Sequence, residues 1–185
     1  MLSIRIATGA LALLLAVTVA LAARPAVADS PAAIDRDVDA ALARLYGSDP
    51  SARSLGSEAR GVLVFPAIVK AGFLFGAQYG EGALRRQGRP AGYYNTVAAS
   101  YGLQAGVQKF GYALFFMSDS ALQYLDTSGG FEVGVGPSIV VLDAGTARAL
   151  TTTTRKSDIY AVFFDQRGLM AGAGLQGSKI TRIDR

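Results

Sequence analysis

Two kinds of hydrophobic pattern divide the chain, and the first of them is helical. From Ser30 to Tyr46, apolar residues recur every three or four positions, which is the spacing of an amphipathic helix. Ser30 is a good N-cap, Pro31 suits the first helical position and Gly47 suits the end. A second, shorter helix is expected from Asp49 toward Ala59. The residues of the first helix expected to face the core are Ile34, Val38, Ala41, Leu42 and Leu45.

From Gly61 onward, short strand-like runs alternate with turn signals such as Gln87-Gly88. Between Gly61 and Leu84, glycine recurs among aromatic and aliphatic residues, and glycine inside a strand marks a bulge, a bend or a close backbone approach. A brief helix is expected between Ser118 and Tyr124. The expected strands are Gly61–Phe65, Ala71–Leu84, Tyr93–Tyr101, Leu103–Gln108, Tyr112–Phe116, Phe131–Leu142, Ile159–Phe164, Leu169–Leu175 and Lys179–Ile183.

The order of these elements predicts the fold class. Helices come first and strands afterwards, and no long helix separates the strands, which disfavours a parallel βαβ layout. The pattern therefore predicts an α+β fold, with N-terminal helices followed by a curved, Gly-rich antiparallel β-sheet (barrel-like) and one short inserted helix. Six phenylalanines are expected in its core: Phe73, Phe75, Phe115, Phe116, Phe163 and Phe164.

The first 28 residues have the layout of a secretory signal peptide. Arg5 supplies a positive start, residues 6–23 form an apolar run, and two small-x-small sites follow. We expect cleavage after Ala28, with Ala22 as the alternative, which leaves a single domain over residues 29–185. An uncleaved membrane anchor is the other interpretation, because the run is nearly long enough to span a bilayer. The pattern predicts an exported protein, periplasmic or envelope-associated.

Charge and cysteine content narrow the possible partners. Of the 18 basic residues, Arg5 and Arg24 lie in the expected leader, so 16 basic and 14 acidic residues remain, a net charge of +2. This weak basicity argues against nucleic-acid binding. Exported domains often carry disulfides, but this chain has no cysteine, so it must be stabilised by an ordinary core. Without a cysteine after the apolar run, a lipoprotein is not expected.

The chain also lacks histidine, which removes most catalytic chemistry. Ser-His and Cys-His nucleophilic sites cannot be built, and zinc, haem and iron–sulfur clusters lose their usual ligands. Glu81 and Asp165 stand inside apolar blocks, where a buried carboxylate can act as an acid or base, but structural hydrogen bonding is the expected role. We expect no enzyme, no cofactor and no metal site.

Four blocks of the chain resemble a known family. They are ARGVLVFPAIVKAGFLFGAQYGEGAL from Ala59, GYYNTVAASYGLQAGVQKFGYALFFMSDSALQYL from Gly92, FEVGVGPSIVVLDAG from Phe131 and GLMAGAGLQGSKI from Gly168. In this order they are similar to the SYLF-domain family, known as lipid-binding and, in yeast, related to actin binding. The resemblance covers roughly residues 51–183, and we interpret the chain as an exported bacterial branch of the family.

The resemblance implies a domain that binds membranes, since eukaryotic members bind phosphoinositide-containing membranes and, in some cases, actin. This chain has no Trp where eukaryotic members tend to carry a Trp-containing segment, and an exported protein would not meet cytosolic actin. The function we expect is a non-enzymatic lipid- or membrane-binding domain of the cell envelope that contacts phospholipid or anionic lipid. The alternative is an envelope structural or host-interaction protein recognised by protein partners. A small outer-membrane barrel is a third interpretation, disfavoured by the substantial helical N-terminus.

The candidate contact residues are basic side chains and tyrosines near the glycines. Arg85, Arg86 and Arg89 surround the Gln87-Gly88 turn, where each would contribute about 1 kcal/mol beside anionic head groups, although a solvated hairpin tip is the alternative. The helix from Ser30 is expected to pack on the core, because its polar face is acidic. The full set of candidate lipid- or membrane-binding residues is Lys70, Arg85, Arg86, Arg89, Tyr93, Tyr94 and Lys109.

Overall fold

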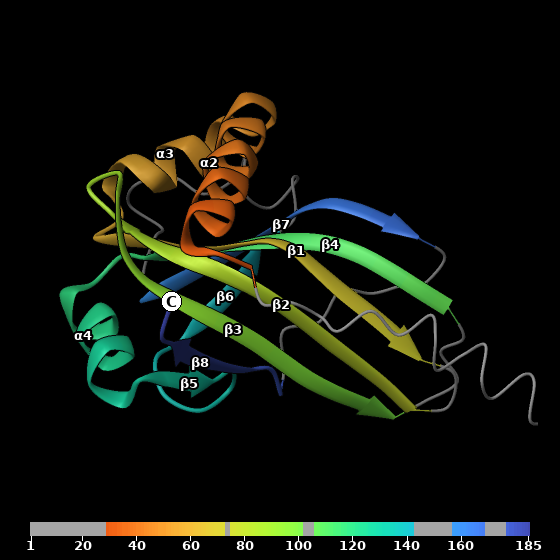
Figure 1. Cartoon of the computed structure of the whole chain (residues 1–185). Coiled ribbons are helices and arrows are strands. Elements are labelled where there is room, and N and C mark those ends of the chain that lie inside the picture. The colour runs from red at the N-terminus through yellow and green to blue at the C-terminus, as the bar shows by residue number, and fades with distance from the viewer. Residues whose placement is uncertain (1–28, 73–74, 102–105, 143–156, 169–176) are drawn as a thin grey trace, which may run out of the picture.

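The structure is a computed structural model, and it describes residues 29–72, 75–101, 106–142, 157–168 and 177–185. Two helices come first and lie against a sheet of long strands, while a third helix follows the fourth strand (Figure 1). The expected leader of residues 1–28 and the expected strand over residues 169–175 lie outside the described residues. The predicted α+β class is confirmed.

The two N-terminal helices begin where their capping residues predict. In α2 (Pro31–Ser48), the Ser30 side chain accepts a hydrogen bond from the Ala33 backbone N–H at 3.2 Å. In α3 (Pro50–Glu58), the Asp49 carboxylate accepts from the backbone N–H groups at the start of the helix. Of the five residues expected to face the core, Leu42 is half-buried and the other four are buried: Ile34, Val38, Ala41 and Leu45.

The described strands form one eight-stranded sheet in the order β5-β8-β3-β2-β1-β4-β7-β6. All neighbouring strands are antiparallel except β6 and β7, which are parallel. The short helix α4 (Asp119–Ser128) lies between β4 and β5 in the chain. The strands are β1 (Gly61–Gly72), β2 (Phe75–Arg86), β3 (Arg89–Tyr101), β4 (Gly106–Phe116), β5 (Gly130–Glu132), β6 (Ile139–Leu142), β7 (Ile159–Gly168) and β8 (Lys179–Ile183).

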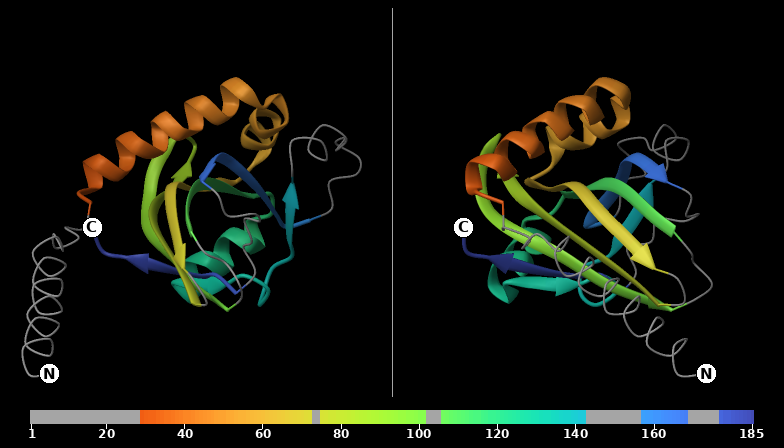
Figure 2. Two further views of the ribbon diagram at one scale, coloured as in Figure 1. Left: turned by 90° about the vertical axis from the view of Figure 1, so that its right-hand side faces the viewer. Right: turned by 45° about the vertical axis from the view of Figure 1, so that its right-hand side comes forward.

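The sheet curls into part of a barrel, and each face has its own core (Figure 2). On the convex face, which we call the outer face, α2 and α3 pack against residues such as Val64, Ala113 and Val162. On the concave inner face, α4 packs against residues such as Phe65 and Leu114. Because both faces of these strand segments are buried, their sequence is a continuous apolar run rather than an alternating one.

Several of the expected strands differ from those in the structure. The stretch Ala71–Leu84 is not one strand, because β1 ends at Gly72 and β2 returns antiparallel from Phe75. A Cβ on Gly72 would lie 2.5 Å from the Gly76 Cα, so this hairpin end requires glycine. The described part of the expected strand Leu103–Gln108, residues 106–108, and the expected strand Tyr112–Phe116 belong to a single strand, β4.

The expected strand Phe131–Leu142 is interrupted. It divides into β5 and β6, which lie on opposite edges of the sheet. Gly134 and Gly136 lie between them with φ angles of +105° and +106°, a conformation that a continuous strand does not use. The Gln87-Gly88 turn is confirmed, with φ values of +51° and +76° that suit a tight antiparallel hairpin.

β1 carries a bulge that divides the sheet into two halves. Its register against β4 shifts between Phe65 and Ile68, and its register against β2 shifts over the same region. The facing strand accommodates the bulge through glycine, since a Cβ on Gly82 would lie 2.1 Å from the Val64 carbonyl oxygen. Beyond the bulge, the strands run past the helices toward the lower right of Figure 1.

Candidate functional site

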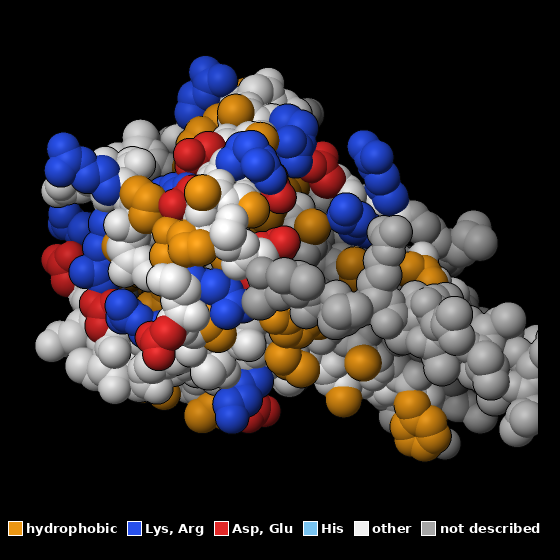
Figure 3. All heavy atoms as spheres, viewed as in Figure 1, with side chains coloured by type: hydrophobic (Ala, Val, Ile, Leu, Met, Phe, Trp, Pro, Cys, Tyr) orange, Lys and Arg blue, Asp and Glu red, His pale blue; other side chains and the backbone are white. Residues whose placement is uncertain are grey.

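Beyond the β1 bulge, the outer face of the sheet is apolar and exposed. We call this surface the outer apolar patch, and Figure 3 shows several separate hydrophobic side chains at this end of the molecule. The large members are well exposed, from 45% for Val97 and 47% for Val69 to 62% for Val107 and 74% for Phe75. The patch is formed by Val69, Ala71, Phe75, Ala77, Tyr79, Val97, Ala99 and Val107.

Strand register arranges these side chains in rows across four strands. Val69 on β1 lies opposite Tyr79 on β2, which lies opposite Val97 on β3. One row further toward the strand ends, Ala71 lies between Ala77 and Val107. The helices α2 and α3 cover the outer face only on the other side of the bulge, which leaves these rows open.

The inner face behind the patch is polar and buried. The Gln78 side-chain amide donates to the Ser178 hydroxyl at 2.9 Å, and the Tyr112 hydroxyl donates to Thr96 at 3.0 Å. Five polar residues of this inner face are at most 9% exposed: Lys70, Gln78, Thr96, Gln108 and Ser178. The polarity of this half of the sheet is thus reversed relative to the usual apolar interior and polar exterior of an antiparallel sheet.

Basic residues flank the first row of the patch on both sides. Lys109 on β4 lies opposite Val69 and, on its other side, opposite Arg167 on β7. On the far side of the row, Lys179 on β8 lies opposite Val97. All three side chains are exposed. The row therefore has an apolar centre and cationic ends, and we call these three residues the cationic flank.

Among the residues predicted from sequence to contact lipid, Arg85 is buried and paired with two carboxylates of α2. Its guanidinium is 4% exposed and donates to Asp35 at 2.7 Å and to Asp39 at 2.8 Å. Burial lowers the pKa of Arg85, but the hydrogen bonds to the two carboxylates outweigh it and leave the pKa above its ordinary value. The Tyr93 hydroxyl donates to Asp35 at 2.9 Å, and burial together with this bond raises the pKa of Tyr93. These residues join α2 to the sheet.

The remaining predicted residues lie in different places. Tyr94 is fully buried, and Lys70 is buried on the inner face of the sheet. Arg86 forms an ion pair with Asp126 of α4. Arg89 is exposed beside the β2–β3 turn, while Lys109 belongs to the cationic flank.

Two groups of predicted residues thus occupy opposite ends of the sheet. Val62 of β1 lies opposite Arg85 of β2. Lys70 is eight residues further along β1 than Val62, which separates the two by about 26 Å at the usual rise per residue. The β2–β3 turn is near α3 in Figure 1, whereas the patch is at the other strand ends. Of the seven predicted residues, only Lys109 is exposed beside the outer apolar patch.

Both carboxylates considered from sequence are held in ion pairs. The Glu81 carboxylate pairs with Arg185 and accepts a hydrogen bond from the Tyr79 hydroxyl at 2.6 Å. Partial burial is the larger cause and this hydrogen bond the next, and together they raise the pKa of Tyr79 to about 12. Asp165 pairs with Arg44 of α2 at 3.0 Å. Within the described ranges, no group of three or more acidic side chains is placed to hold a metal ion.

Sequence reasoning missed the patch because Phe75 was expected in the core. The structure instead exposes it, while Phe115, Phe116 and Phe164 are buried and Phe163 is half-buried. The available signal was a change of pattern along β1 and β2. The continuous apolar run before Pro66 gives way to an alternating pattern on β1 and β2. In this pattern Lys70 and Gln78 each stand between two apolar residues of the opposite face.

Comparisons with known proteins bear on the second half of the chain. No curated protein matches it at a significant level. In the described part of the chain, no helix is both long and apolar enough to cross a membrane. Residues 97–184, just under half of the chain, match a family model, and this segment includes Val107 and the cationic flank. That segment matches the Ysc84 family, described as Las17-binding protein actin regulator, which is the SYLF family that the sequence resembles.

Proposed function

We propose that this protein is an exported, non-enzymatic domain of the bacterial cell envelope that binds membranes containing anionic phospholipid. The outer apolar patch enters the headgroup and upper acyl region, and the cationic flank lies against the lipid phosphates. The leader-like N-terminus supports export. For an exported protein, a bilayer is an accessible partner, whereas cytosolic actin is not.

The reversed polarity of the sheet is the observation that carries this proposal. Strands that face lipid place apolar residues outward and polar residues inward, with a period of two. Val69, Ala71 and Val107 face outward, while Lys70 and Gln108 on the same strands face inward and are buried. A soluble domain has no need to place polar side chains inside and valines outside at the same level of the sheet.

The depth of the patch fits interfacial contact. Tyr79 and Phe75 are four residues apart on β2, which corresponds to about 13 Å along the strand. Amphipathic elements that lie in the membrane interface insert their apolar face about 5–10 Å deep, a distance of the same order as the length of the patch. Tyr79, in the first row of the patch, has an apolar ring and a polar hydroxyl, which suits the headgroup level.

Vesicle co-sedimentation tests the proposal. The full chain is expressed, and the mass of the purified protein shows where the leader was removed. Replacing Val69, Val97 and Val107 by Ser should lower binding to vesicles that contain phosphatidylglycerol. Each valine contributes roughly 1 kcal/mol when it leaves water, so the triple variant should bind roughly a hundredfold more weakly.

A matched control uses three valines that are similarly exposed elsewhere. Val135 is 61%, Val140 37% and Val141 51% exposed, and the last two lie on β6 at the far edge of the sheet. Their replacement by Ser should leave vesicle binding unchanged. Equal losses in the two triple variants, or no vesicle binding by the wild type at any lipid composition, would contradict the proposal. Binding to an envelope protein without binding to vesicles would instead favour a protein partner.

A further inference from the structure

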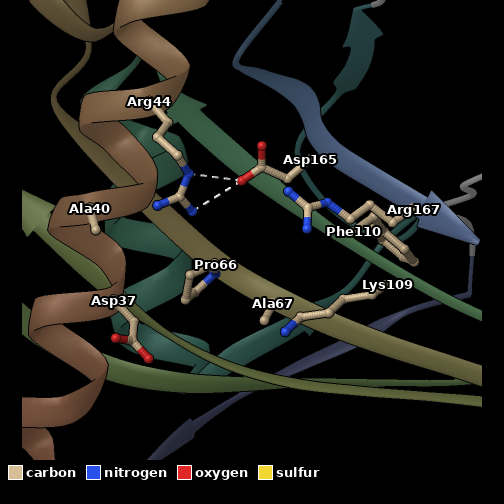
Figure 4. Close-up of a pocket in the computed structure, with 9 residues that line it drawn as sticks. All are labelled: Asp37, Ala40, Arg44, Pro66, Ala67, Lys109, Phe110, Asp165 and Arg167. Carbon is tan, nitrogen blue, oxygen red and sulfur yellow. Dashed lines mark hydrogen bonds and ion pairs between the residues drawn. The ribbon is translucent and has the colours of Figure 1, made fainter.

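Bulges in neighbouring strands open a hollow between α2 and the outer face of the sheet. Pro66 and Ala67 form the bulge of β1, and the register of β4 against β7 also shifts, between Lys109 and Gly111. The resulting cavity has a volume of about 420 Å³. Figure 4 shows it between α2 on one side and β1, β4 and β7 on the other. Bulges often re-aim side chains at functional sites.

Two cations reach into this hollow, and neither is paired with an acid among the described residues. Lys109 and Arg167 are direct cross-strand partners on β4 and β7, and like charges in that position destabilise a sheet. Among the described residues, neither of them forms an ion pair or a side-chain hydrogen bond. In Figure 4 both side chains extend from their strands into the hollow. Such a pair is stabilised when an anion lies between the two charges.

A third cation, Arg44 of α2, completes the group, and the nearby acids are engaged. The Asp165 carboxylate accepts a hydrogen bond from the Arg44 guanidinium at 3.0 Å. Asp165 has a φ of +52°, a left-handed conformation that is uncommon for a residue other than glycine. Asp37 pairs with Arg36 at 3.2 Å. The hollow thus has three cationic and two acidic side chains on its wall. Asp165 pairs with Arg44, and Asp37 pairs with Arg36, so neither acid is paired with Lys109 or Arg167.

The position of the hollow relates it to the membrane. Lys109 is in register with Val69, in the first row of the outer apolar patch. When the patch lies in the bilayer interface, the hollow is therefore at the level of the lipid phosphates. Its walls combine cations with the apolar residues Ala40, Pro66 and Ala67, which suits a small polar group attached to an apolar chain.

We propose that the hollow binds the phosphate group of an anionic phospholipid, with Lys109 and Arg167 as direct ligands and Arg44 as a third cation. The inference rests on the proposed membrane contact and adds a defined headgroup site to it. Arginine and lysine are the usual phosphate-binding side chains, through bidentate and point-charge contacts respectively.

Two variants with opposite effects test the site. K109Q/R167Q should reduce binding to vesicles of phosphatidylcholine with added phosphatidic acid by about tenfold or more. D165N should increase it, because Asn tolerates a left-handed backbone and releases Arg44 from the carboxylate. R60Q/R89Q is the matched control: it also removes two positive charges, from the opposite end of the sheet, and should bind like the wild type. Urea unfolding of each variant shows that the fold is retained.

The outcomes separate this site from the general membrane contact. Suppose that the triple valine variant of the patch loses vesicle binding, whereas the binding of K109Q/R167Q still rises with phosphatidic acid. This result supports the membrane contact and overturns the headgroup site. Equal losses in K109Q/R167Q and R60Q/R89Q also overturn it, because only overall charge then matters. A titration with sn-glycerol 3-phosphate, followed by amide chemical shifts, identifies the source of the phosphate. If this soluble ester binds the hollow and K109Q/R167Q binds vesicles as tightly as the wild type, the site binds a free phosphate ester and the lipid assignment is wrong.

Discussion

The Arg85 guanidinium donates a hydrogen bond to the Asp35 carboxylate at 2.7 Å and joins β2 to α2 across fifty residues of sequence. The same side chain donates to Asp39 through two nitrogens and to the Asp35 backbone carbonyl. This makes the basic cluster beside the β2–β3 turn, in part, a structural joint. Arg85 holds the helix that covers the near half of the sheet, and the far half stays open.

Arg85→Gln should lower the free energy of unfolding by about 2–3 kcal/mol. The change removes charge-assisted hydrogen bonds from a side chain that is 4% exposed and leaves two carboxylates without their partner. Urea unfolding followed by circular dichroism measures the difference. The control is Arg36→Gln, whose ion pair with Asp37 is exposed and should contribute within about 0.5 kcal/mol. Similar effects of the two changes would show that the joint does not stabilise the fold.

Gly82→Ala should destabilise the protein by about 1–3 kcal/mol, the usual cost of overpacking a buried site. The new Cβ would meet the Val64 carbonyl oxygen at 2.1 Å, and that oxygen belongs to the backbone at the β1 bulge. Gly47→Ala is the matched control, because it lies in α2 with no atom within 4 Å of its new Cβ. Alanine favours helix over glycine, so the control should be neutral or stabilising. Thermal unfolding of the two variants distinguishes these directions.

Stability should fall as pH rises above 10, in part through Tyr112. Burial is the larger influence and raises the pKa of Tyr112, while its hydrogen bond to Thr96 acts in the opposite direction. Above pH 10 the unfolded tyrosine therefore loses its proton while the native one keeps it, so its contribution to stability is present below pH 10 and lost above it. Between pH 10 and 12, Tyr112→Phe should reduce the pH slope by about 1.4 kcal/mol per pH unit.

The alkaline measurement needs two comparisons. At neutral pH, Tyr112→Phe should cost about 1 kcal/mol, because Thr96 loses its hydrogen-bond donor inside the core. Tyr124→Phe removes an exposed hydroxyl and serves as the control for the urea unfolding series. An unchanged slope in the Tyr112 variant would mean that this group does not govern the alkaline transition.

Val107→Ser should separate binding from folding. The side chain is 62% exposed, so its loss should change the free energy of unfolding by no more than about 0.5 kcal/mol. The neighbouring Phe110 is buried in the inner core, and Phe110→Ala should cost about 3–5 kcal/mol. Vesicle binding should weaken in the Val107 variant while its urea midpoint stays that of the wild type. A large loss of stability in that variant would show that the patch is part of the packed core.

Local structure in this chain was readable from sequence where the cause is local. Ser30 and Asp49 cap their helices as predicted, because capping depends on one side chain and the first few backbone N–H groups. The Gln87-Gly88 turn and the α+β order of elements were also predictable. The long stretch Ala71–Leu84 was not, because its apolar and glycine residues suit a strand and a hairpin end equally well.

Sequence patterns alone predicted the N-terminal helices, the Gln87-Gly88 turn, the Gly-rich strands and the lack of histidine and cysteine chemistry. Which stretch of each strand face meets water depends on how the helices pack on the sheet. Val64 and Val69 are both valines of β1, yet the first is covered by the helices and the second is 47% exposed. The physical reason is that alternation fixes which residues share a face, whereas the reach of α2 and α3 determines where that face is covered. The same reason places Arg85 in a joint and Lys109 at the candidate membrane contact.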